Sequence, residues 1–170
     1  MPAHIGDIIR YGLVALFCLL LLTAAVSDIR TRRIPNWTVL AVMALAIGSA
    51  FFGPAASFLS AIEGGAVALA VTLGLYAFGI VGAGDSKLFS AVALFVGLQF
   101  LAYLAVITAL AGGVLAIITL ILNPVRALAI FHMRGKGKKG EGIPYGVAIA
   151  LGGIAVAVSA SLGKLSPGVF

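Results

Sequence analysis

The sequence predicts an all-α membrane protein, a single domain over residues 1–170 built as a bundle of six transmembrane helices. Its composition leads to this fold class, because 62% of the residues are hydrophobic and only 9% are charged. A soluble domain is closer to half apolar and a quarter charged. In addition, short polar breaks divide the chain into apolar runs, and about 20 apolar residues suffice for one membrane-spanning helix. No polar segment is long enough to form a second domain.

Each apolar run predicts one helix, and prolines and glycines mark most of the ends. We expect four of the six spans at residues 11–27, 37–52, 62–81 and 143–162. Proline disfavours a helical conformation in the residue before it, so Ile34-Pro35-Asn36 predicts a short loop after the first span. Gly53-Pro54 ends the second span. Pro144 falls in the first turn of the last span, where a proline costs little.

The remaining apolar stretch, residues 88–122, predicts two helices instead of one. Its 35 residues would form a helix of roughly 50 Å, whereas the hydrocarbon core of a bilayer is about 30 Å thick. A single helix would also place the basic clusters at residues 30–33 and 126–139 on opposite sides of the membrane. We therefore expect the chain to turn back near Gly97–Gln99, which makes the fourth helix short.

The formal net charge of +6 is explained by membrane topology rather than by nucleic-acid binding, because the basic residues flank the apolar runs. A turn near residue 97 puts nine of the eleven Lys and Arg residues on the cytoplasmic face. Both termini then lie on the outer side of the membrane. The first helix is expected to be retained, because a cleaved signal peptide has its basic residues before the apolar run. The basic segment 123–142 is either a simple connector or a contact for anionic lipid headgroups.

Only five residues of the chain are acidic, and Asp28 and Asp85 each stand where an apolar run meets a cytoplasmic loop. Two carboxylates held close together share one proton. The ionised one can activate water while the protonated one polarises a carbonyl group, as in an aspartic protease. Purely structural roles also stay open for both acids: Asp85 suits the N-cap of a helix, and Asp28 can pair with Arg30 or Arg32.

Three short motifs resemble those of the type IV prepilin peptidases and occur in that family's order. The first is Asp28 followed by Ile34-Pro35-Asn36. The second is Gly82-Ala83-Gly84-Asp85-Ser86-Lys87, whose glycines let the backbone approach a substrate closely. The third is Ile143-Pro144-Tyr145-Gly146. Together with the six spans, the resemblance covers nearly the whole chain.

The resemblance implies an aspartyl endopeptidase embedded in the bacterial inner membrane, which removes the short basic leader from prepilins at the cytoplasmic face. Asp28 and Asp85 would be its catalytic pair. The other motif residues would bind substrate or shape the loops around the pair; they are Pro35, Asn36, Gly82, Gly84, Lys87, Pro144, Tyr145 and Gly146.

The chain is similar to the short, peptidase-only members associated with Flp, or tight-adherence, pili. Larger members carry an insert between the first two helices, often with paired Cys-x-x-Cys motifs, and also N-methylate the mature pilin. Here residues 28–36 make the whole connection, and Cys18 is the only cysteine. We therefore expect no methyltransferase activity, no metal and no cofactor. The particular prepilin and the oligomeric state stay open.

Two other functions are compatible with the same acids. A small proton- or ion-coupled transporter would use them on an ion path, but it needs acids near the membrane midplane. A non-catalytic scaffold would use its glycines and alanines only for close helix packing. Replacing Asp28 or Asp85 by asparagine separates these functions, because only the peptidase would lose prepilin cleavage.

Overall fold

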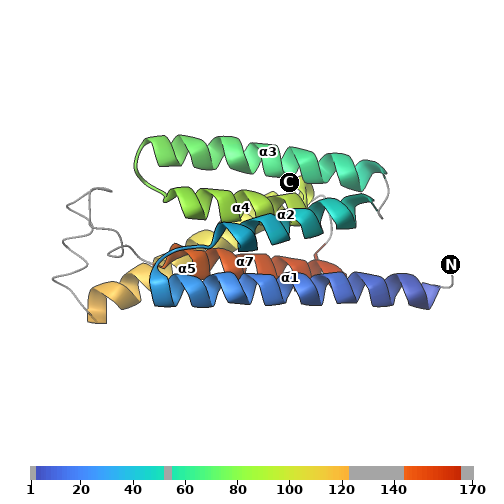
Figure 1. The fold of residues 1–170 in the computed structure, drawn as a ribbon, viewed down its shortest axis with the longest axis horizontal. Helices are drawn as coiled ribbons and strands as arrows, with labels where there is room; N and C mark the ends of the chain where they lie inside the picture. Colours follow the sequence, from blue (N-terminus) through green and yellow to red (C-terminus); the bar gives the residue numbers. More distant parts are fainter. Residues whose placement is uncertain (1–2, 52–54, 123–143, 166–170) are drawn as a thin grey trace.

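The computed structural model describes residues 3–51, 55–122 and 144–165, which form helices and no strands. The expectation of an all-α protein is confirmed for these residues. Figure 1 shows the helices running along a common direction. They are α1 (Ala3–Thr31), α2 (Asn36–Phe51), α3 (Ala55–Ala77), α4 (Ala83–Val96), the 3-10 helix η1 (Leu98–Phe100), α5 (Leu101–Leu122) and α7 (Tyr145–Ser161).

The helix ends differ from the expected ones at functionally important places. The first helix continues to Thr31, so Asp28 lies inside its last turn instead of after it. The third helix begins at Ala55 and ends at Ala77, about one turn before the expected end. The basic segment 123–142 and the Gly53-Pro54 helix end lie outside the described residues.

The expected turn between the fourth and fifth helices is confirmed at Gly97. This glycine has a φ of +80°, a conformation that favours glycine, and its N–H donates to the carbonyl of Ala93. The next amide, that of Leu98, donates to Oγ of Ser60 on α3 at 3.1 Å. A side chain at Gly64 would meet the backbone of Gly97 and Leu98 at 2.7 Å, so the turn rests directly on α3.

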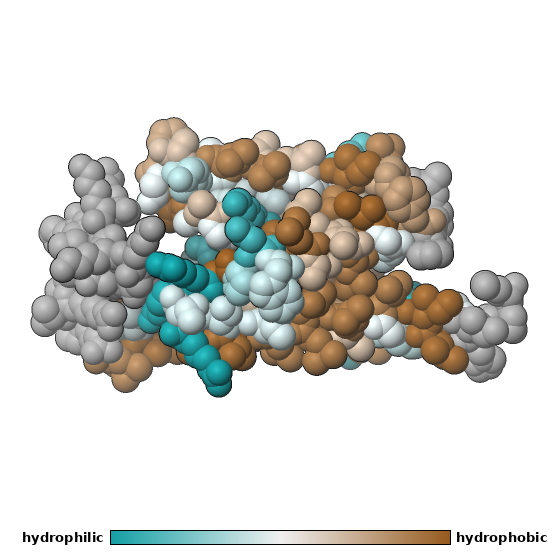
Figure 2. Space-filling view, in the orientation of Figure 1, coloured by the Kyte–Doolittle hydropathy of each residue, from teal (hydrophilic) through white to brown (hydrophobic). Residues whose placement is uncertain are grey.

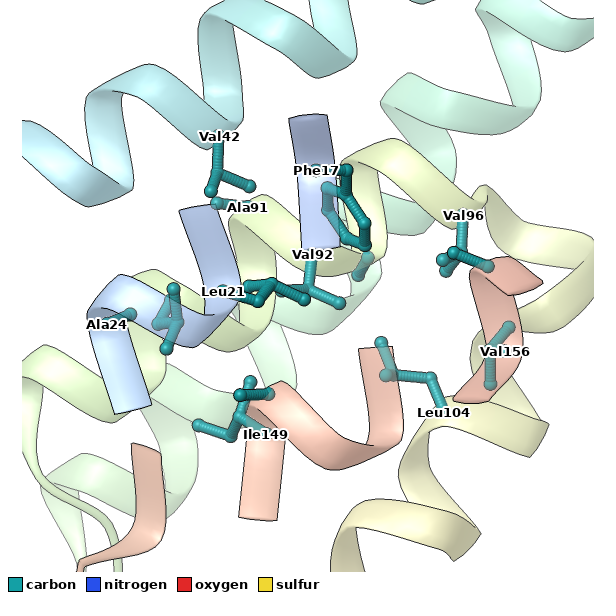
Figure 3. Packing of buried hydrophobic residues seen from close by; sticks show 14 of the residues in the cluster. Phe17, Leu21, Ala24, Val42, Ala91, Val92, Val96, Leu104, Ile149 and Val156 are labelled. Atoms are coloured by element: carbon teal, nitrogen blue, oxygen red, sulfur yellow. The ribbon is translucent and has the colours of Figure 1, made fainter. Parts of the chain in front are cut away.

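Helix α4 lies at the centre of the bundle and packs against α2, α3 and α7. Its 14 residues make it the shortest α-helix of the described residues, as expected. Leu21 of α1, Val92 of α4 and Ile149 of α7 meet in the core (Figure 3). The ring of Phe17 stacks on that of Phe95 with centroids 3.9 Å apart. This packing holds the N-terminal ends of α4 and α7 beside the C-terminal end of α1.

The outer surface is largely apolar, as a bilayer requires. In the part of the chain that the structure describes, three helical segments are long and apolar enough to cross a membrane: Ile8–Thr31, Phe58–Ala77 and Leu98–Leu122. The shorter helices α2 and α7 are also apolar. Hydrophobic residues cover most of the face seen in Figure 2, and hydrophilic ones gather toward one end. The chain is therefore a membrane protein by the character of its helices.

Candidate active site

Asp28 is buried in the last turn of α1, where only 6% of its surface is exposed. The N–H of Gly146 donates to its Oδ2 at 2.9 Å. Gly146 lies in the first turn of α7, just after Pro144, which is the N-cap of that helix. A Cβ at Gly146 would lie 2.8 Å from Oδ2, so only glycine lets the backbone approach the carboxylate this closely. The third sequence motif therefore supplies the backbone amide that holds the Asp28 carboxylate in place.

Asp85 lies in the first turn of α4, three residues after the N-cap Gly82. The Asp85 carboxylate turns back toward the Gly82 backbone, as in one half of a capping box, so that a Cβ added to Gly82 would lie 2.9 Å from Oδ2. The N-cap role that the sequence allowed for Asp85 therefore belongs to Gly82. Gly84 is also helical, so it does not shape a loop as the sequence predicted. A Cβ added to Gly84 would lie 3.7 Å from the Cβ of Ile34.

The two aspartates lie at the same end of the bundle, the left-hand end in Figure 1, where α1 ends and α4 and α7 begin. The side chain of Ile34, in the loop after α1, lies beside both Gly84 and Gly146, and a Cβ added to them would come within 3.7 Å and 3.1 Å of it. Asp85 lies in the first turn of α4, ahead of the apolar residues that begin at Leu88. Burial, and next the charge of Asp28, raise the pKa of Asp85 to about 6. The two carboxyl groups are thus close enough to influence each other.

The remaining residues of the motifs have separate places. The Pro35 carbonyl accepts hydrogen bonds from the N–H of Thr38 at 3.1 Å and from its hydroxyl at 2.7 Å, and so begins α2. Asn36 and Lys87 are exposed and line a cavity of about 530 Å³ between α2, α3 and α4, and neither aspartate is part of its wall. The ring of Tyr145 packs over Gly112 of α5. The structure thus gathers Gly82, Gly146 and the aspartates, and places Asn36 and Lys87 to one side.

Comparison with known protein families agrees with this arrangement. The model of the type IV leader peptidase family matches residues 15–117, more than half of the chain. This protein belongs to the type IV leader peptidase family. The matched region contains both aspartates and ends before Gly146. No curated protein and no solved structure matches the chain significantly.

Membership of the leader peptidase family indicates a peptidase whose substrates are proteins of the prepilin kind. Hydrogen bonds and buried helix contacts hold both acids of this leader peptidase in place. Among residues 3–51, 55–122 and 144–165, no three His, Cys, Asp or Glu side chains come together in a way that could hold a metal ion.

One feature of the leader peptidase was missed in the sequence, a group of hydroxyl side chains behind Asp85. Ser86 is buried, and its hydroxyl lies 3.1 Å from the Gly82 carbonyl and 3.3 Å from the Thr72 carbonyl of α3. Ser90 donates to the Ser86 carbonyl at 2.8 Å and lies 3.4 Å from the Thr72 hydroxyl. These contacts attach the first turn of α4 to α3. The available signal was the spacing of four residues between two serines in an apolar helix.

Proposed function

We propose that this leader peptidase is a membrane-embedded aspartyl endopeptidase that removes the short basic leader of Flp-type prepilins at the cytoplasmic face. Asp28 and Asp85 are its catalytic pair. The observation that carries the proposal is their placement: both acids lie at one end of the bundle, where the Gly146 N–H donates to Asp28 and the Gly82 backbone lies against the Asp85 carboxylate. The transporter alternative needs acids near the midplane, whereas these acids are at helix ends.

Both acids are partly or fully buried, but their neighbours favour different roles in hydrolysis. Burial opposes ionisation of Asp28, whereas the Gly146 N–H that it accepts and the charge of Arg32 favour it, so Asp28 is the better candidate for the ionised base. Asp85 is suited to be the protonated partner, because burial and the neighbouring charge of Asp28 raise its pKa to about 6. The pair as a whole holds one proton.

The reaction follows from these roles. Asp28 takes a proton from water as the water oxygen attacks the scissile carbonyl carbon, and Asp85 gives its proton to the carbonyl oxygen. The tetrahedral intermediate then collapses: a hydroxyl group returns its proton to Asp85, Asp28 protonates the amide nitrogen, and the carbon–nitrogen bond breaks. The products are the leader with a new carboxyl terminus and the pilin with a new amino terminus. The chain's own residues supply every proton transfer, and no cofactor takes part.

We further propose that the six α-helices of the described residues cross the bacterial inner membrane, with both termini on the outer side. The cluster Arg30–Arg33 follows the buried Asp28 and favours a cytoplasmic position for this end of the bundle. The 14 residues of α4 extend about 21 Å, less than the roughly 30 Å of the hydrocarbon core. A helix this short leaves room for water to reach Asp85 from the cytoplasm.

The same chain is proposed to be a peptidase only, without N-methyltransferase activity. Helix α1 ends at Thr31 and α2 begins at Asn36, so the connection that carries the insert in larger members is four residues long. This prediction is checked by mass spectrometry of the mature pilin after co-production with this enzyme alone. An unmethylated amino terminus is expected, and a mass increase of one methyl group would contradict it.

The catalytic pair is tested by co-producing an Flp-type prepilin with Asp28→Asn and Asp85→Asn variants. Each variant should lower cleavage by about 100-fold or more, because each removes a proton-transfer group. Glu63→Gln is the matched control: Glu63 is an exposed acid on α3, away from the pair, and its replacement should leave cleavage unchanged. Membrane insertion is verified for all three variants. Normal cleavage by either aspartate variant would refute the assignment.

A further inference from the structure

An apolar cavity of about 300 Å³ opens beside Asp85, between α3 and α5. Its back wall is formed by α4, through Asp85 and Phe89, and by α7, through Tyr145 and Ile149. Its sides include Val71 of α3 and Ala105 of α5. One end of the cavity therefore lies at the candidate active site, and the rest extends along the helices into the apolar part of the bundle.

The walls of this cavity suit an apolar group and disfavour a polar one. The Thr72 hydroxyl on the wall already donates to the Ala68 carbonyl at 2.7 Å. The Thr108 hydroxyl lies against Gly152 of α7, so it is turned toward that helix. A polar side chain that entered would lose its hydrogen bonds to water and find few in exchange, which costs free energy. An aliphatic or aromatic side chain would instead exchange water or lipid for close contacts with the walls.

The position of Asp85 in the cavity wall indicates which part of the substrate enters the cavity. A peptide bond hydrolysed by the pair must place its carbonyl group within hydrogen-bonding distance of the carboxyl groups. A side chain next to that bond then lies at the mouth of the cavity. Asp85 thus belongs both to the site of bond cleavage and to the cavity wall.

We propose that this cavity is the specificity pocket of the peptidase, that it receives the apolar side chain adjoining the scissile bond, and that Ala105 limits the size of that side chain. This inference rests on the proposed peptidase function and adds to it the residues that select the substrate.

Ala105 is suited to this role by its small size and its exposure. Its methyl group lines the cavity and is not covered by neighbouring side chains. A larger residue at this position therefore extends into the cavity without displacing core side chains. Ala102 lies on the same helix one turn earlier, is exposed as well, and is not part of the cavity wall. The substitutions Ala105→Leu and Ala102→Leu make the same chemical change inside and outside the pocket.

The test is a competition between two Flp-type prepilins that differ only in the residue after the cut, leucine in one and alanine in the other. The wild-type peptidase should prefer the leucine substrate. Ala105→Leu should lower the ratio of kcat/KM for leucine over alanine at least tenfold, since the loss of room for one or more methylene groups has effects of about 10- to 200-fold. Ala102→Leu should keep the wild-type ratio. A thermal unfolding curve in detergent confirms that both variants are folded.

The outcomes separate the pocket from the peptidase function. An unchanged ratio in the Ala105→Leu variant, with cleavage that still requires Asp28 and Asp85, would overturn the pocket and leave the function standing. Loss of a co-purifying lipid from this variant, without a change in the ratio, would likewise overturn it and assign the cavity to lipid. Cleavage by a chain lacking both aspartates would overturn the proposed function and with it the pocket.

Discussion

Replacing Gly146 with alanine displaces the Asp28 carboxylate without removing any polar group. The new Cβ would lie 2.8 Å from Oδ2, and also 3.1 Å from both Cγ of Asp28 and Cδ1 of Ile34. Non-bonded contacts are most favourable near 3.5 Å, so relief of the 2.8 Å contact requires a movement of about 0.7 Å. A displacement of about 1 Å in a catalytic group can cost 100-fold in rate. We expect Gly146→Ala to reduce kcat/KM for prepilin cleavage by tens to a hundredfold.

The variant should also be less stable, by about 1–3 kcal/mol, because the first turn of α7 has no spare volume at this point. Gly113→Ala is the matched control, since Gly113 lies within α5 and no heavy atom comes within 4 Å of an added Cβ. It should keep full activity, because alanine is favoured over glycine inside a helix. The assay is cleavage of purified prepilin in detergent, with thermal unfolding of each variant. Cleavage by folded Gly146→Ala within threefold of the wild-type rate would refute the reasoning.

Two further predictions concern stability. Asp85→Asn should be inactive but more stable than wild type at pH 7. The pKa of Asp85 is raised from 3.8 to about 6, so the free energy of unfolding of the wild type falls by about 2 kcal/mol as pH rises from 4 to 7, a decrease that the asparagine variant avoids. Unfolding curves at pH 4 and pH 7 measure this, and an equal difference at both pH values would contradict it. Gly64→Ala should be strongly destabilising, because its Cβ would meet rigid backbone at 2.7 Å. A Cβ added to Gly65 meets a leucine side chain that can move, so Gly65→Ala should lower the stability less than Gly64→Ala does. A larger loss of stability in Gly65→Ala than in Gly64→Ala would be inconsistent with this packing.

The three motifs form parts of one arrangement. Asp28 lies in the last turn of α1, and Gly146 at the start of α7 donates to it. Gly82 is the N-cap of α4, and its backbone lies against the Asp85 carboxylate. The Ile34 side chain lies beside Gly84 and Gly146, where a Cβ added to either glycine would meet it. The motif residues thus act on the two carboxyl groups largely through backbone amides and close packing, which explains why glycine occupies the positions nearest to them.

Some features could be predicted from the sequence because they depend on local chemistry. Apolar composition and the lengths of the runs indicated membrane helices, and the excess length of residues 88–122 indicated the turn that the structure has at Gly97. The helix ends near Asp28 and Asp85 were less accurate. Asp28 was placed after α1 and Asp85 at a possible N-cap, because an acid normally marks the end of an apolar helix. In the folded chain, a backbone amide of α7 compensates for burying Asp28 within a helical turn.

The sequence by itself determined that this is an apolar helical protein, where its helices break, and which two acids stand out from the apolar runs. Only the tertiary structure decided what surrounds those acids: a glycine amide 118 residues away from Asp28, a hydroxyl group on α4 against α3, and an apolar cavity beside Asp85. The physical reason is that hydropathy and helix signals act over one or two turns, whereas the environment of a carboxyl group is set by helices far apart in the chain. Gly146 illustrates both: a local motif supplies the glycine, and the packing of α7 against α1 brings its amide to Asp28.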